Sequence, residues 1–180
     1  MGNFISAMYF INQAIKHRDE NYFVIANSFN IKGILLLESI PPKPNESLPF
    51  FKKAELNLKK FKPNIRIDYR EEELIAFLSR IYNNIGLAYA NIKNYSAAIN
   101  YYQKSLRLKR KVGNLDGICI TATNICLAYL YSSKKNNYYF WKKKKFFLLD
   151  KYGFSFSKAY FYRECGEYFC NQKKIKRGLE

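Results

Sequence analysis

Cysteine and histidine are the residue types in this sequence that most often bind a metal ion. The four cysteines include no C-x-x-C pair, and the only histidine, His17, is far from all of them along the chain. Because a zinc site needs several such ligands close together, we expect no metal site and no cofactor. Cys119 and Cys126 are two turns apart on one helical face and are expected to be buried as small apolar side chains, the alternative being a disulfide. The cysteines are Cys119, Cys126, Cys165 and Cys170.

A catalytic site needs a nucleophile or a base held beside a group that orients it. His17 is followed by one basic and two acidic residues, a run that is typical of a solvated helix end. The acidic run at residues 71–73 is typical of a helix start, where the helix dipole stabilises carboxylates. Gly33, Gly86 and Gly166 each stand alone, so the sequence shows no phosphate-binding glycine loop. These features indicate a protein that is not an enzyme.

The formal net charge of +17 raises the question of a polyanionic partner. From Ser132 to the end there are 13 basic and 4 acidic residues, and four consecutive lysines there follow the aromatic residues 138–141. Such a segment could hold phosphates with its lysines and stack bases on its rings. The alternative is the lysine-rich outer face of a helix whose aromatic residues pack inward. The four lysines are Lys142, Lys143, Lys144 and Lys145.

A repeated segment indicates which elements position these residues. Residues 84–89 read Asn-Ile-Gly-Leu-Ala-Tyr, and residues 124–129, forty positions later, read Asn-Ile-Cys-Leu-Ala-Tyr. Gly113 and Gly153 are also forty positions apart. Two independent features therefore have the same period, which is typical of stacked structural repeats.

Each period contains two segments with helical spacing of apolar residues. These segments are residues 80–92 and 96–111, and the polar link between them is so short that the two helices must be antiparallel. Ser96 is expected to cap the second helix, with its hydroxyl accepting from a backbone N–H of the first turn. The predicted fold class is all-α, made of stacked antiparallel helix hairpins.

From Ser79 onward the sequence also contains an ordered set of large, small and aromatic residues: Tyr82, Ile85, Gly86, Tyr89, Ala98, Tyr102 and Ser105. This order and spacing resemble the tetratricopeptide repeat family. We expect Gly86 and Ala98 to let the two helices approach closely, while Tyr89 and Tyr102 fill the space between hairpins. The resemblance implies a right-handed superhelical solenoid of such hairpins.

The period and one residue differ from the commonest form of this family. Arg110 stands where the family usually has proline, and the period is 40 rather than 34 residues. The sequence in this respect resembles the longer variant found in kinesin light chains and bacterial signalling arrays.

The whole chain, residues 1–180, is predicted to be one array of about four units, of which the first and last are incomplete. Further helices are expected at residues 21–39, 47–61 and 71–92, with Phe51 and Ala54 corresponding to Tyr95 and Ala98. Residues 40–49 hold four prolines and are expected to form a rigid extended insertion. Residues 138–151 are expected to form a degenerate repeat helix, because the small packing residues are lost there.

The resemblance implies a concave groove lined by the first helices, in which this family binds an extended peptide or a partner helix. Asn83 is the leading candidate, because an amide can bond both the N–H and the C=O of a peptide, and the alternative is an asparagine solvated on a helix face. The residues expected to face the groove are Arg80, Asn83, Leu87, Asn91, Thr123, Leu127, Tyr131 and Arg163.

The function expected is that of a non-enzymatic protein–protein interaction scaffold, as the sensor or docking part of a larger bacterial signalling or regulatory protein. The alternative is a basic helical repeat module that binds nucleic acid or another polyanion through Lys142 to Lys145. The sequence has no long apolar run and no signal-peptide pattern. We therefore expect no membrane insertion and a cytoplasmic location.

Overall fold

The computed structural model describes residues 2–16, 22–61, 71–133, 137–143 and 163, and all of its regular structure within these ranges is helical. The labelled helices are α1 (Gly2–Lys16), α2 (Tyr22–Glu38), α3 (Pro44–Lys60), α4 (Glu71–Asn91), α5 (Tyr95–Lys111) and α6 (Leu115–Tyr131). A short further helical segment covers residues 137–143. The expected all-α fold is confirmed.

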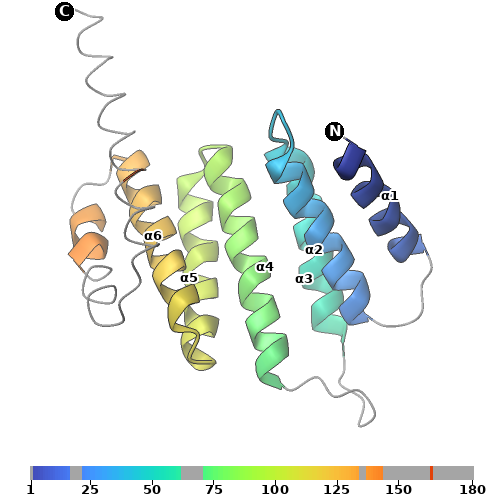
Figure 1. Cartoon of the computed structure of the whole chain (residues 1–180). Helices are drawn as coiled ribbons and strands as arrows, with labels where there is room; N and C mark the ends of the chain where they lie inside the picture. Colours follow the sequence, from blue (N-terminus) through green and yellow to red (C-terminus); the bar gives the residue numbers. More distant parts are fainter. Residues whose placement is uncertain (1, 17–21, 62–70, 134–136, 144–162, 164–180) are drawn as a thin grey trace, which may run out of the picture.

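The helices are arranged as a row of hairpins (Figure 1). Helices α2 and α3 pack against each other, α4 and α5 do the same, and α3 contacts α4 while α5 contacts α6. Figure 1 shows α2, α4 and α6 in front, with α3 and α5 behind them, and we call these the front layer and the rear layer. Helix α1 packs against α2. This arrangement is a helical repeat solenoid, as predicted.

Asparagine determines where two of the helices begin. The α4–α5 and α5–α6 turns each have one residue with positive φ, Lys93 at 63° and Gly113 at 66°, followed by an asparagine. The Asn94 backbone N–H donates to the Tyr89 carbonyl (2.9 Å), which closes α4, while its side chain accepts from the Ala97 N–H (3.1 Å), which starts α5. Asn114 does the same between α5 and α6. The expectation that Ser96 caps α5 is therefore wrong, because Asn94, two residues earlier, supplies the acceptor at the start of the helix.

Glycine–aromatic contacts join the two layers within each hairpin. A Cβ atom added to Gly86 would lie 2.5 Å from Cδ1 of Tyr102, so the ring rests on bare backbone. A Cβ atom on Gly33 would lie 2.5 Å from Cε1 of Phe51. Phe51 thus has the role of Tyr102, and the expected correspondence of Phe51 with Tyr95 is wrong. The close approach expected at Gly86 is present.

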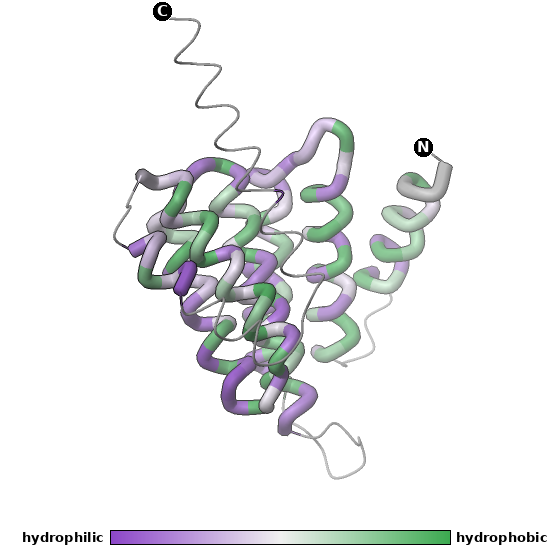
Figure 2. Tube along the Cα trace, turned by 60° about the vertical axis from the view of Figure 1, so that its left-hand side comes forward, coloured by the Kyte–Doolittle hydropathy of each residue, from purple (hydrophilic) through white to green (hydrophobic). Residues whose placement is uncertain are grey.

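Two clusters of buried side chains form the core. One includes Phe51, Phe77 and Ile85 and joins α2, α3 and α4, and the other joins α5, α6 and Tyr138. Apolar and polar segments alternate along the tube in Figure 2, as expected of helices that bury one face. Cys119 and Cys126 are fully buried, as predicted.

Two predicted segments differ from the structure or lie partly beyond it. Residues 40–49 are not an extended insertion, because α3 begins at Pro44 and contains Pro49. Proline is well accommodated at the first helical position, where its missing N–H would have no helical partner. Of the expected helix at residues 138–151, residues 138–143 are helical, and Tyr138 is buried; the remainder lies outside the described residues.

Membrane spans were sought in the part of the chain that the structure describes. None of its helices combines the length and the apolar character needed to cross a bilayer.

Candidate functional groove

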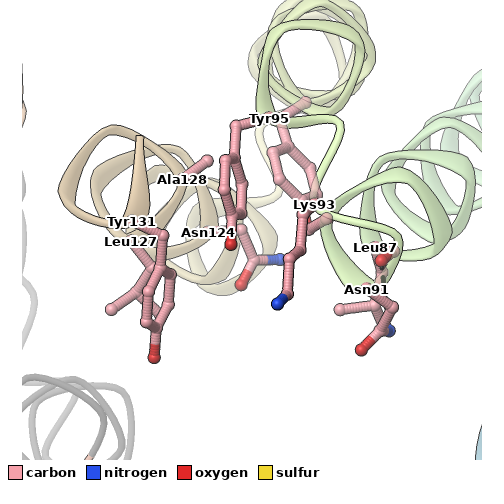
Figure 3. A pocket seen from close by; sticks show the side chains of 10 residues that line it. Leu87, Asn91, Lys93, Tyr95, Asn124, Leu127, Ala128 and Tyr131 are labelled. Atoms are coloured by element: carbon pink, nitrogen blue, oxygen red, sulfur yellow. Dashed lines mark hydrogen bonds between the residues drawn. The ribbon is translucent and has the colours of Figure 1, made fainter. Parts of the chain in front are cut away.

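A groove of about 320 Å³ lies between α4 and α6 in the front layer (Figure 3). Leu87 and Asn91 come from α4, while Leu127 and Tyr131 come from α6. Figure 3 shows these two walls facing each other, with the α4–α5 turn between them. The full lining is Leu87, Ala90, Asn91, Lys93, Tyr95, Tyr102, Asn124, Leu127, Ala128 and Tyr131.

The groove combines an apolar floor with a polar rim. Leu127 is almost fully buried and Leu87 is 38% exposed, so the leucines form a floor that a ligand can reach at one side. The rings of Tyr95 and Tyr131 stack with centroids 6.0 Å apart and an interplanar angle of 17°. The Lys93 side chain is exposed and adds a positive charge at the rim. Such a site can bury an apolar side chain while its edge bonds polar groups.

The structure brings together four of the eight residues expected to face the groove, namely Leu87, Asn91, Leu127 and Tyr131. Arg80 is exposed, but its guanidinium lies 5.3 Å from the Phe77 ring centroid and does not line the groove. The expectation for Thr123 is wrong. Its side chain is 1% exposed and its hydroxyl donates to the Cys119 carbonyl at 3.0 Å, because it points into the core.

Asn83, the leading candidate, bonds within the array instead of lining the groove. Its Oδ1 accepts from Asn124 Nδ2 at 3.2 Å and from the Thr121 hydroxyl at 3.3 Å. The same contact occurs one hairpin earlier, where Asn30 Oδ1 accepts from Asn84 Nδ2 at 3.0 Å. We call these two contacts the amide ladder. It joins α2 to α4 and α4 to α6, so Asn83 connects successive hairpins of the front layer.

A buried lysine continues this network into the rear layer. Lys109 Nζ donates to the Thr121 hydroxyl at 2.8 Å and to the Gly117 carbonyl at 3.1 Å. Burial lowers the pKa of Lys109 to about 8; the nearby carboxylate of Asp116 acts in the opposite direction, and Arg80 adds to the lowering. Helices α4, α5 and α6 are thus joined by one chain of polar contacts.

Comparison with protein-family models identifies the central hairpin. The model of the tetratricopeptide repeat matches residues 79–111, which cover the second half of α4 and all of α5. Residues 79–111 form a tetratricopeptide repeat. Repeats of this type generally mediate protein–protein interactions and are typically not enzymes. A search of curated proteins found no match to the chain.

The matched tetratricopeptide repeat contributes one wall of the groove and the turn beneath it. Sequence reasoning missed Lys93 and Tyr95, which it assigned only to the polar link, and Asn124 and Ala128. The Asn-Ile motif that begins at residue 84 and again at residue 124 indicated that these positions are equivalent on α4 and α6. It did not show that Asn124 reaches both Asn83 and the groove.

The remaining predicted site residues are only partly described. Lys142 Nζ lies 5.9 Å from the Tyr138 ring centroid, and Lys143 is exposed. Lys144 and Lys145 lie outside the described residues, so polyanion binding by this run stays a prediction. Arg163 is exposed, and the residues on both sides of it lie outside the described ranges. Among the described residues, no group of histidine, cysteine or acidic side chains could hold a metal ion.

Replacing Asn83 with alanine should weaken the helical array. The change removes the acceptor of two half-buried hydrogen bonds, from Asn124 and Thr121, each worth about 0.5–1.5 kcal/mol. Urea unfolding followed by circular dichroism would measure this loss. Asn100→Ala is the matched control, because Asn100 is exposed on α5 and should change the unfolding free energy by less than about 0.5 kcal/mol. Equal midpoints for the two variants would contradict the amide ladder.

Proposed function

We propose that the chain is a protein–protein interaction scaffold that binds an extended peptide or a partner helix in the groove between α4 and α6. The observation that carries this proposal is the convergence of Leu87, Asn91, Leu127 and Tyr131 on one hollow. These residues come from the equivalent helices of successive hairpins. Their convergence supports binding on the front layer rather than on an isolated helix surface.

The groove suits a ligand that inserts one or two apolar side chains. Its volume of about 320 Å³ is at the lower end of the range of small-molecule sites, so it would take anchoring side chains rather than a whole ligand. The stacked rings of Tyr95 and Tyr131 offer a flat wall beside the leucine floor. Lys93 and Asn91 at the rim would bond the ligand's carbonyl or carboxylate groups.

The resemblance to signalling arrays adds a wider proposal. The scaffold would serve as the sensor or docking part of a larger bacterial signalling or regulatory protein, with the groove as the site that recognises its partner. A partner bound at the α4–α6 junction would contact two hairpins at once. It would therefore favour one relative position of the two hairpins, which is how binding could reach the rest of an array.

A peptide library displayed on phage, selected on the intact chain, would test the groove. Peptides with an apolar anchor should be enriched, and Leu87→Lys should weaken the selected peptides at least about tenfold, which corresponds to roughly 1.4 kcal/mol. Leu56→Lys is the matched control, because Leu56 is 54% exposed on α3, in the rear layer. Binding that survives Leu87→Lys, or that falls equally in both variants, would refute the assignment.

A further inference from the structure

Charge is distributed unequally between the two layers of the array. In the front layer, α2 carries one lysine and one glutamate, α4 carries three glutamates in its first turn and one arginine, and α6 carries Asp116 and no basic residue. In the rear layer, α3 carries four lysines against two glutamates. Helix α5 has no acidic residue, and its basic residues are Lys104, Arg107, Lys109, Arg110 and Lys111. A lysine-rich composition alone would place lysines equally on both layers. The excess of positive charge on the rear layer therefore needs another explanation.

Most cations of the rear face have no carboxylate partner among the residues that the structure describes. Within the described ranges, Glu55 is shared by Lys52 (3.9 Å) and Lys59 (2.6 Å), and Lys111 pairs with Glu71 of α4 (3.1 Å). The other cations of α3 and α5 that reach solvent form no ion pair with described residues. They are Lys53, Lys60, Lys104, Arg107 and Arg110.

The two rear helices are joined by side chains that concentrate this charge. Lys52 Nζ donates to the Tyr101 hydroxyl and lies 4.2 Å from the Tyr101 ring centroid. Lys104 Nζ lies 4.6 Å from the same centroid. Partial burial lowers the pKa of Lys52, the carboxylate of Glu55 raises it, and the positive charges of Lys104 and Lys59 lower it further. Like charges are therefore held close together between α3 and α5, and a bound anion would relieve their repulsion.

We infer that the rear face of α3 and α5 binds the phosphate backbone of a nucleic acid, independently of the peptide groove in the front layer. The cations lie on two helices, which Lys52 and Tyr101 join, rather than along a single helix. A duplex carries one negative charge per about 1.7 Å of its axis and can match such a band without sequence-specific contacts. Apart from Leu56, no large apolar side chain of α3 or α5 is exposed among the described residues, which disfavours insertion into a lipid surface.

Fluorescence anisotropy with a labelled 20-base-pair DNA duplex of mixed sequence, titrated with the full chain, would test this surface. The dependence of affinity on salt between about 50 and 200 mM reports the number of phosphates neutralised. The test variant combines Lys104→Gln, Arg107→Gln and Arg110→Gln on the rear layer. The control combines Lys32→Gln, Arg80→Gln and Lys93→Gln, which lowers the net charge equally on the front layer and its turn.

The rear variant should bind at least about tenfold more weakly at low salt, with a slope of log affinity against log salt smaller by about 2–3. The control should retain the slope of the unmodified chain. An equal loss in both variants would show attraction by net charge alone and would overturn the assignment, as would the absence of binding by the unmodified chain at 50 mM salt. Displacement of the duplex by polyglutamate or by anionic lipid vesicles at equal charge concentration would point to an acidic protein or a membrane and would also overturn it.

Discussion

Replacing Tyr102 with alanine is expected to lower the unfolding free energy by about 3–5 kcal/mol, the range for removing a buried aromatic side chain. Tyr102 is 2% exposed and packs in the cluster that joins α5 and α6. Its ring rests on the backbone at Gly86, where helix and ring are too close for any Cβ atom. Glycine has no side chain that could move into the hollow left by the ring on that side. Urea unfolding followed by far-ultraviolet circular dichroism would give the loss directly.

Gly86, on the α4 side of this contact, allows a double-mutant cycle with Tyr102. Gly86→Ala should destabilise the unmodified chain by about 1–3 kcal/mol through overpacking, although alanine favours a helix over glycine by about 1 kcal/mol. In the Tyr102→Ala background the added methyl group meets no ring, so Gly86→Ala should become neutral or stabilising. Additive effects in the two backgrounds would show that Gly86 and Tyr102 do not form the contact described.

The second large effect concerns pH and Lys109. Its folded pKa of about 8 lies below the unfolded value of 10.5, so between these values the unfolded chain binds more protons than the folded chain. The unfolding free energy should therefore rise with pH through this window, by about 2 kcal/mol between pH 8 and pH 10. Below pH 8 the ammonium is charged in both states and its full desolvation cost remains. Above about pH 10, Tyr82 acts in the opposite direction, because burial raises the pKa of its phenol.

Urea unfolding at several pH values, with Lys109→Met as the test variant, would isolate this contribution. Methionine keeps the length of the side chain and removes the titrating group, so the rise between pH 8 and pH 10 should shrink by about 2 kcal/mol. The contribution of Lys52, whose pKa burial also lowers, should remain. Lys53→Met is the matched control, because Lys53 is exposed on α3 and should leave the rise unchanged. If Lys109→Met retains the same rise, another group titrates in this window and the assignment to Lys109 is incorrect.

The positions of the helices could be predicted because the apolar period and the turn residues act locally. The spacing of Ile81, Ile85 and Ala88 indicates a helix whatever lies beside it, and all three are fully buried. The start of α5 could not be predicted to the residue, because Asn94 and Ser96 are both good caps. The choice depends on the preceding turn, whose backbone already places Asn94 at the end of α4. The correspondence of Phe51 with Tyr102 likewise required the contact with Gly33.

The helices that form the groove could be predicted from the sequence, but not all of the residues that line it. Equivalent positions on α4 and α6 identified Leu87, Asn91, Leu127 and Tyr131. Which further residues line the groove depends on how α4 and α6 are inclined to each other. The sequence alone does not give that angle. Thr123 therefore faces the core, and Asn83 is hydrogen-bonded to Asn124 of the next hairpin instead of facing the groove. The pairing of Asn83 with Asn124 depends on side chains forty-one residues apart.

The amide ladder has a mechanical consequence. Stacked repeats contact only their neighbours, so the stiffness of the array is determined by the contacts at each junction between hairpins. Packing of apolar side chains resists separation of two hairpins, and interdigitated side chains also give some resistance to sliding. A hydrogen bond between two amides is directional and breaks when either helix shifts along its axis by a fraction of a turn. The front layer of this array should therefore be stiff against shear, whereas its hairpins can still bend about the ladder as a hinge line.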